Sequence, residues 1–374
     1  MKPCKSTGTT MRRLAAFSTL LVVVAACGGS PTGNGDNQGD GGGGAADEDA
    51  FAEVFEQLEG LEGQARTDKL VELATEEGEL NIYTSNTDLD DFADEFTDEY
   101  GLEVSVYRAQ ANQVLQRLLQ ENEAGFAGAD LYDTNAKELG IANSEGLLRE
   151  YEGPVAETLV DAALQEGWVG SRLNLFTPTW NTERVNQPPT SYQDLADPRF
   201  EGQVLMEPRA FEWYMTLFTY FTEEEGMEPE EVDQMFADMA ANSTIVEGNT
   251  EHAEFIASGE HAVSASVYNH LVDELADDGA PVSRTPAVEP VVVRPNGVGL
   301  LRSAQNPAFA VLFMEWLLTD GQELLLDEFR IPVREELQQP EIRELQTVMV
   351  DTQKLVDEGS EWEERYDELV REAQ

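Results

Sequence analysis

Residues 80–107, LNIYTSNTDLDDFADEFTDEYGLEVSVY, decide the fold of this chain. The short apolar run LNIYT that opens the stretch predicts a strand. From 87 to 100 apolar side chains recur at helical spacing, with Thr87 as the expected N-cap and Gly101 as the residue that ends the helix. A second strand is expected at 102–107, so the stretch forms a strand–helix–strand unit.

The same alternation surrounds this unit on both sides. A helix is expected at 66–78 before it, and after it a helix at 111–124, a strand at 129–133 and a helix near 136–146. Strands that alternate with crossover helices at this spacing favour a parallel α/β sheet.

Beyond residue 170 the chain changes character, and longer extended stretches appear between turns and helices. Extended stretches are expected at 174–180, 204–208, 262–268 and 289–304, with a turn-rich segment at 187–204. Helices are expected at 211–223, 228–241, 306–319 and 321–328, with a short helix that ends at Gly259. The last 35 residues favour helix, with Trp362, Tyr366 and Leu369 on one face.

The extended stretches near 172–180 and 286–295 are expected to cross between two lobes. The expected boundaries are 51–78 for an N-terminal helical segment, 79–175 plus 288–335 for a discontinuous first lobe, 176–287 for a second lobe and 336–374 for a C-terminal helical segment. Ligands of open α/β sheets bind beyond the carboxyl ends of the strands, so the cleft between the lobes is the expected site.

The N-terminus predicts export. The apolar run LAAFSTLLVVVAA follows two arginines and is too short for a membrane span of about 20 residues, which favours a signal peptide over 1–26. Residues 24–27, VAAC, resemble the lipobox of bacterial lipoproteins, and the resemblance implies cleavage before Cys27 and lipidation of that residue. Either Met1 or Met11 can serve as the start.

Residues 27–50 contain almost no apolar side chains, which predicts a flexible tether between a lipid anchor and the folded body. Cys4 lies in the expected leader and Cys27 carries the lipid, so the body has no thiol. The folded part must therefore be held by a hydrophobic core, since it has no disulfides.

The chain has 74 acidic and 23 basic residues, a formal net charge of −51. Nucleic acid and anionic membrane are poor partners for such a surface. The acidic residues are spread over every segment, which favours a solvated surface adapted to high salt over a dedicated sink for cations. The acidity also implies that folding requires salt, because screening weakens the repulsion between like charges.

The order of motifs over residues 66–335 is similar to that of the ferric-iron-type (type II) solute-binding proteins of bacterial ABC importers. The matching stretches are LATEEGELNIYTS, TWNTERVNQPPTSYQDLADPRFEGQV and NPAFAVLFMEWLLTDGQELL. The resemblance implies a two-lobed α/β fold of the Venus-flytrap type with a hinge between the lobes. It also implies a monomeric binding protein, not an enzyme, that delivers a small solute or chelated iron to a permease and its ATPase.

Members of that family that bind bare ferric ion typically use two adjacent tyrosines, a histidine after the first strand and a glutamate after the third. This chain departs from that set at each position. The position of the histidine falls on Asn86 or Thr87, and that of the glutamate on Asn135. The tyrosine pair falls on Tyr268–Asn269 or Asn269–His270. Tyr268 and His270 remain as candidate metal ligands, which are too few to close a ferric site. Ferric ion prefers anionic oxygen, which asparagine does not supply.

The expected cleft instead presents neutral and cationic donors. The candidate ligand-binding residues are Thr84, Ser85, Asn86, Thr87, Thr134, Asn135, Arg209, Tyr268 and Asn269. A strand that ends at a helix N-terminus favours an anion, and an arginine can clamp a carboxylate or phosphate. The set suits a small oxyanion, a phosphorylated or carboxylated organic solute, or ferric ion with its own chelator. Arg209 can equally pair with Glu207 or Glu212.

The sequence bears on two alternative functions. A secreted hydrolase is disfavoured because the sequence has no G-x-S-x-G or H-E-x-x-H motif and no cysteine nucleophile, and its three histidines all lie between 252 and 270. A sensory or adhesion lipoprotein that reuses the binding fold is a second alternative. No cofactor is implied, although Fe³⁺ is a possible cargo.

Overall fold

The computed structural model describes residues 47–372. The expected signal peptide, the lipidated Cys27 and most of the tether lie outside the described residues and stay predictions. The structure contradicts one boundary, because helix α1 (Asp47–Leu58) begins inside the range expected for the tether. Phe51, Val54 and Leu58 explain the helix, since they are spaced along one face and are buried in the core of the first lobe. No helix among the described residues is long and apolar enough to cross a bilayer.

The first lobe contains the parallel α/β unit that the sequence predicts. Its elements in chain order are α2 (Gly63–Glu76), β1 (Leu80–Thr84), α3 (Leu89–Tyr100), β2 (Val104–Arg108), α4 (Ala111–Glu123), β3 (Leu131–Asn135) and α5 (Ala136–Ser144). Strand β1 pairs in parallel with both β2 and β3. Gly101 ends α3 with φ 70°, as expected. The predicted N-cap is wrong: the cap is Asp88, and the Thr87 hydroxyl donates to the Asp88 carboxylate.

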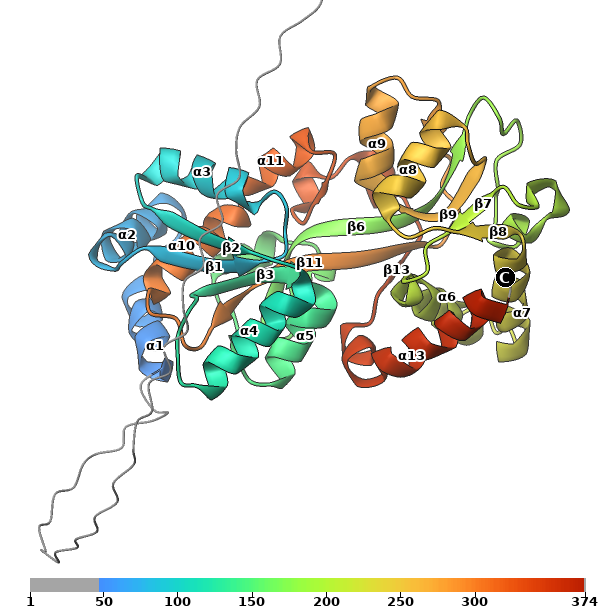
Figure 1. Ribbon diagram of the computed structural model, residues 1–374. Helices are drawn as coiled ribbons and strands as arrows, with labels where there is room; N and C mark the ends of the chain where they lie inside the picture. Colours follow the sequence, from blue (N-terminus) through green and yellow to red (C-terminus); the bar gives the residue numbers. More distant parts are fainter. Residues whose placement is uncertain (1–46, 373–374) are drawn as a thin grey trace, which may run out of the picture. The chain divides into compact units, whose positions relative to one another are not determined.

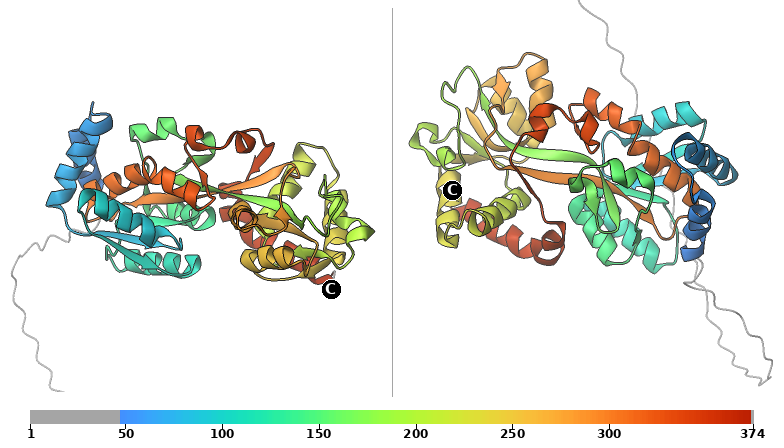
Figure 2. Two further views of the ribbon diagram at one scale, coloured as in Figure 1. Left: turned by 90° about the horizontal axis from the view of Figure 1, so that it is seen from above. Right: turned by 180° about the vertical axis from the view of Figure 1, so that it is seen from behind.

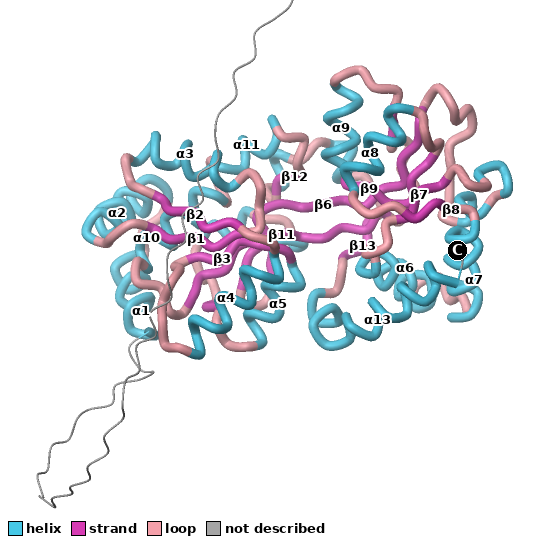
Figure 3. Tube along the Cα trace, in the orientation of Figure 1, coloured by secondary structure: helices cyan, strands magenta, loops and turns pink. Residues whose placement is uncertain are grey.

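Two long strands, β6 (Trp168–Asn181) and β11 (Val291–Leu301), lie side by side and run through both lobes (Figure 1). They pair antiparallel with each other, and β11 also pairs antiparallel with β3. The sheet order is β2-β1-β3-β11-β6-β9-β7-β8, so the sheet is mixed where a parallel one was expected. The continuous path of the strands is visible in Figure 3.

The second lobe repeats the strand–helix pattern on a smaller sheet. Its elements are β7 (Val204–Met206), α6 (Phe211–Glu223), α7 (Pro229–Ala241), β8 (Ser243–Ile245), α8 (Asn249–Ser258), β9 (Val263–Tyr268), α9 (Asn269–Asp277) and β10 (Val282–Ser283). Strand β7 pairs in parallel with β8 and β9, and β9 pairs antiparallel with β6. Gly259 ends α8 with φ 73°, as predicted.

The C-terminal part returns from the first lobe to the second. Its elements are α10 (Pro307–Leu317), α11 (Gly321–Asp327), β12 (Ile331–Pro332), α12 (Pro340–Arg343), β13 (Thr347–Met349) and α13 (Thr352–Glu372). The expectation of helix over this end misses β13, which pairs in parallel with β11. The predicted face of α13 is confirmed, because Trp362 and Tyr366 are buried in the second core and Leu369 packs against it. The right-hand view of Figure 2 shows the red α13 beside the yellow-green α6.

The remaining elements are short. They are the strands β4 (Leu148–Arg149) and β5 (Leu164–Gln165) and the 3₁₀ turns Pro154–Thr158, Asp161–Ala163, Gln193–Ala196, Pro198–Phe200 and Glu335–Leu337. Two of these turns account for the turn-rich stretch expected at 187–204.

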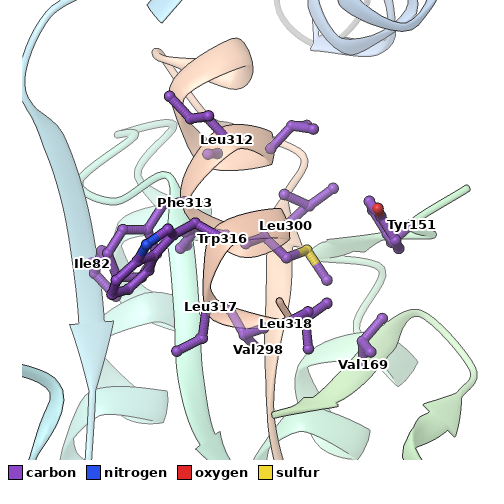
Figure 4. Packing of buried hydrophobic residues seen from close by; sticks show 14 of the residues in the cluster. Ile82, Tyr151, Val169, Val298, Leu300, Leu312, Phe313, Trp316, Leu317 and Leu318 are labelled. Carbon is purple, nitrogen blue, oxygen red and sulfur yellow. The ribbon is translucent and has the colours of Figure 1, made fainter. Parts of the chain in front are cut away.

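Each lobe has its own hydrophobic core, and β6 contributes side chains to both. The first core surrounds α10, which is buried along its whole length (Figure 4). The one carboxylate of α10, Glu315, accepts hydrogen bonds from the Arg66 guanidinium at 2.8–3.0 Å and from the Tyr151 hydroxyl at 2.9 Å. The buried charge is therefore paired, as a low-dielectric interior requires.

Phe96 is the central aromatic residue of the first core and gives a test of this packing. Its ring lies 5.1–5.8 Å from those of Phe309, Phe313 and Trp316, and the side chain has no exposed surface. Phe96→Ala is expected to lower the free energy of unfolding by about 3–5 kcal/mol, because it removes buried surface and leaves a cavity. Urea denaturation measures the change.

The matched control is Phe126→Ala, since Phe126 is 59% exposed. That substitution is expected to change the free energy of unfolding by less than about 0.5 kcal/mol. Equal losses in the two variants would show that the core is placed wrongly.

Candidate functional site

A cavity of about 530 Å³ lies over β6 and β11, where elements of both lobes meet. The first lobe contributes the β1–α3 loop, the start of α5 and the segment after α11. The second lobe contributes the starts of α8 and α9. The lining residues include Ser85, Asn86, Thr87, Asp88, Asn135, Arg172, Asn174, Asn249, Thr250, Tyr268, His270, Glu274, Arg294, Asn296, Glu328 and Arg330.

Four helices begin at this cavity. The N-caps of α3, α5 and α9 are the lining residues Asp88, Asn135 and Tyr268, and α8 begins at the lining residue Asn249. Asp88, Asn135 and Tyr268 make no side-chain hydrogen bond to their own helices, and the cap of α8 is Gly248, which has no side chain. A helix N-terminus presents backbone N–H groups and the positive end of the helix dipole, so the arrangement favours an anion.

The floor of the cavity is a small polar grid on the two long strands. Arg172 and Asn174 alternate on β6, and Arg294 and Asn296 alternate on β11, in the register Arg172↔Asn296 and Asn174↔Arg294. All four side chains are buried. Asn174 donates to the Asn296 carbonyl oxygen at 3.1 Å, and Asn296 donates to Asn135 at 3.0 Å. The amides thus form a chain across three strands.

Arg294 is held by groups of the second lobe. Its guanidinium pairs with Glu212 at 2.9 Å and donates to the Tyr268 hydroxyl at 3.1 Å. It also lies 5.5 Å from the ring centre of Phe176 and 5.6 Å from that of Tyr268. Burial alone would lower the pKa of Arg294, but Tyr268 and Glu212 outweigh it and raise that pKa, so the side chain stays charged.

Arg172 and Arg330 are held by groups of the first lobe. Arg172 faces Asp133 at 3.7 Å, and Arg330 pairs with Asp88 at 2.5 Å. Burial raises the pKa of Asp133, while Arg172 and a hydrogen bond from Thr84 oppose that rise. Burial also lowers the pKa of Arg172, and Asp133 opposes it. Each charge therefore depends on its partner, as expected for a buried pair.

His270 is a neutral member of the cavity wall. Its ring stacks on Tyr268 with centres 5.8 Å apart and an interplanar angle of 14°. Burial, then Arg330 and Arg172, lower the pKa of His270 to about 3. The Nδ1 atom is buried and has no hydrogen-bond partner. The ring is therefore uncharged near neutral pH.

Six of the residues predicted from sequence line the cavity together: Ser85, Asn86, Thr87, Asn135, Tyr268 and His270. Thr84 and Thr134 lie behind it and are fully buried. The Thr84 hydroxyl donates to Asp133 and accepts from the Asn86 backbone, and Thr134 shares a hydrogen bond with Ser85 at 2.7 Å. These two threonines shape the loops and do not reach the cavity.

The structure places two predicted residues away from the cavity. Asn269 accepts a hydrogen bond from the backbone of Leu175 and donates to the Phe329 carbonyl, so it fastens α9 to β6. Arg209 is 69% exposed and pairs with Glu247 on the surface. The two partners considered for Arg209 are engaged differently: Glu207 accepts from its backbone N–H, and Glu212 pairs with Arg294.

Sequence reasoning missed the three arginines that line the cavity. Arg172 and Arg294 stand inside the apolar stretches SRLNLF and VVRPNGV, each two residues from an asparagine. A period-two polar pattern within an otherwise buried strand is the signal that identifies them. Arg330 follows α11 in an irregular segment and has no such pattern.

The donor set does not resemble a site for a bare metal ion. No group of three or more His, Cys, Asp or Glu side chains is placed to hold a metal within residues 47–372. The three guanidinium groups would repel a trivalent cation across a poorly screened cavity.

Comparisons with known proteins agree on one family. Residues 142–350, more than half of the chain, match the family described as "Bacterial extracellular solute-binding protein". The chain is 26% identical over 295 residues to Iron uptake protein A1 from Synechocystis, a match that covers 72% of this chain and 80% of that protein.

Two solved structures show the same fold at low identity. Iron-bound HitA from Pseudomonas aeruginosa is 19% identical, with a TM-score of 0.65, and the match covers 78% of this chain and 99% of that one. AfuA from Actinobacillus pleuropneumoniae with bound fructose-6-phosphate is 21% identical, with a TM-score of 0.64, covering 79% of this chain and 99% of that one.

The lowered pKa of His270 gives a test by NMR. An ordinary histidine titrates near 6.5, so the His270 ring is expected to stay neutral at pH 5 in the ligand-free protein. Between pH 6.5 and about 3 the unfolded chain binds a proton that the folded chain does not. The free energy of unfolding is therefore highest, as far as His270 is concerned, above pH 6.5, and His270 lowers it progressively as the pH falls from 6.5 toward about 3.

The measurement is an imidazole ¹⁵N titration, which is simple because the chain has three histidines. The variant His270→Gln assigns the signal, and its unfolding free energy should fall less between pH 7 and pH 5 than that of the wild type. A His270 ring that titrates near 6.5 would contradict its placement in the cavity wall.

Proposed function

Since this chain belongs to the family of bacterial extracellular solute-binding proteins, we propose that it captures an oxyanionic solute in the cavity between its lobes. It is a binding protein of the type II, ferric-iron-type group and not an enzyme. It works outside the cytoplasm, as the family description says. Delivery of the solute to an ABC permease with its ATPase is part of the proposal.

The observation that supports an anionic solute is the meeting of Arg172, Arg294 and Arg330 with four helix N-termini in one cavity. Guanidinium forks and helix N-termini both bind carboxylate and phosphate oxygens. The nearest carboxylates are already committed, because Asp88 and Glu212 pair with arginines. Glu274 and Glu328 are exposed at the rim.

The same geometry supports closure of the lobes around the solute. Helices α3 and α5 belong to the first lobe, and α8 and α9 to the second. An anion that meets N-termini from both sides would draw the lobes together, with β6 and β11 acting as the hinge. We keep the lobe boundaries expected from the sequence as part of this proposal.

A second candidate cargo is ferric ion carried by an anionic chelator. It is favoured by the similarity to Iron uptake protein A1 and to iron-bound HitA, and by Tyr268 and His270 in the cavity wall. A chelate with net negative charge would meet the same arginines, whereas a bare ferric ion would not. The candidate metal ligands Tyr268 and His270 therefore remain part of this second candidate alone.

Membrane attachment through a lipid on Cys27 is also proposed, because residues 24–27, VAAC, resemble a lipobox. We propose that the protein acts as a monomer. Residues of both lobes of one chain line the cavity, so the proposed site does not need a second copy.

The proposal predicts a loss of anion binding in Arg330→Gln. Citrate and glycerol 3-phosphate serve as probes, and their affinity is measured by isothermal titration calorimetry. The variant is expected to bind at least one of them roughly 10- to 150-fold more weakly, because a hydrogen bond to a charged group contributes about 1.5–3 kcal/mol.

Arg209→Gln is the matched control, since this arginine lies outside the cavity, and its affinities should equal those of the wild type. The proposal fails if neither probe nor any other oxyanion binds, or if Arg330→Gln and the wild type bind alike.

A further inference from the structure

The two arginines of the cavity floor are diagonal neighbours on the antiparallel strands. Arg172 stands opposite Asn296, and Arg294 stands opposite Asn174. Diagonal positions in such a ladder are about 7–8 Å apart at the backbone. The hydrogen bond from Asn174 to Asn296 occupies the other diagonal. A pair of amides therefore separates the two guanidinium groups.

The first-lobe end of the cavity contains two guanidinium groups. Arg172 faces Asp133 of β3, and Arg330 pairs with Asp88 at the start of α3. The two arginines lie close enough for Arg330 to lower the pKa of Arg172. The N-terminus of α3 belongs to the same end, so this end can hold one anionic group.

The second-lobe end contains Arg294 and Tyr268. Tyr268 accepts a hydrogen bond from Arg294, so its own hydroxyl proton can be donated to a ligand. Arg294 is buried and held in place by Glu212 and by the rings of Phe176 and Tyr268. This end can hold a second anionic group, among groups of the other lobe.

The cavity is far larger than a single small inorganic anion. Its volume of about 530 Å³ is more than ten times the roughly 30 Å³ that one water molecule occupies in the liquid. An inorganic anion at one end would leave the other end to solvent, and the arginine Nε atoms there, which are buried and have no hydrogen-bond partner, would stay unsatisfied.

We propose that the solute is an organic dianion with two anionic groups separated by a short carbon chain, one group at each end of the cavity. The chemical class is that of dicarboxylates, tricarboxylates and phosphorylated carboxylic acids. The inference rests on the proposed function. In the bound state the carbon chain lies over the paired amides of Asn174 and Asn296, which separate the two ends. Each lobe then holds one end of the same molecule, which couples binding to closure.

The experiment compares two-ended anions with one-ended analogues of the same length. Calorimetry is carried out with the dicarboxylates from malonate to pimelate and with their monomethyl esters. A second set consists of 3-phosphoglycerate, glycerol 3-phosphate and glycerate, in which each analogue lacks one anionic group. At least one two-ended anion is expected to bind about tenfold or more tightly than each of its analogues.

Two variants locate the ends. Arg330→Gln should lower the affinity for one of the two one-ended anions, glycerol 3-phosphate or glycerate, and Arg294→Lys should lower the affinity for the other. Each variant should bind 3-phosphoglycerate about tenfold or more weakly than the wild type. The lysine keeps a cation beside Glu212, so the buried carboxylate is not left alone. Arg209→Gln is the control, and thermal unfolding checks that every variant is folded.

The outcomes separate this inference from the proposed function. If oxyanions bind but every one-ended analogue binds as tightly as its two-ended partner, the inference is wrong and the proposed function stands. The inference is also wrong, and the proposed function stands, if Arg330→Gln and Arg294→Lys lower the affinities for all the anions by the same factor. If no oxyanion binds, both are wrong.

Discussion

The antiparallel pairing of β6 with β11 is the constraint on which the rest of the structure depends. The two strands contribute to both cores and also form the floor of the cavity. Because the arginines of this floor are buried, each positive charge needs a nearby carboxylate. Arg294 is compensated by Glu212 from the second lobe, and Arg172 by Asp133 from the first. In the proposed closure the hinge and the binding site are thus one element, so a bound solute would contact the part of the chain that moves.

The protein combines an acidic exterior with a cavity lined by three arginines. A formal net charge of −51 repels anions at long range, whereas in the proposed complex the three arginines bind them at contact. Salt shortens the range of the exterior field to about 10 Å at 0.1 M. The buried arginines are screened far less, because they are enclosed by protein. A high-salt medium is therefore expected to lower the barrier to entry more than it weakens the proposed site.

The sequence predicted the fold better than the site, for physical reasons. The alternation of strands and helices was predicted correctly, and so were the helix ends at Gly101 and Gly259. Each of these features depends on a few neighbouring residues. The loops after β1, β3 and β9 were found because strand ends converge in an α/β sheet. Arg172 and Arg294 were missed because the extended stretches were interpreted only as connections between lobes. Arg209 was chosen for its position after a strand, but its side chain faces solvent. Asn269 faces the hinge, a direction that strand–helix spacing does not determine.

The central claim is that the cavity holds a polyanion and not a bare metal ion. The most direct test is native mass spectrometry of protein that has been purified from its own cells without chelators. Phosphorus and iron are measured in the same sample. The account predicts a co-purified organic molecule with at least two anionic groups, either free or as the chelator of iron. One iron atom per protein with no organic anion, or a neutral or cationic molecule, would contradict it.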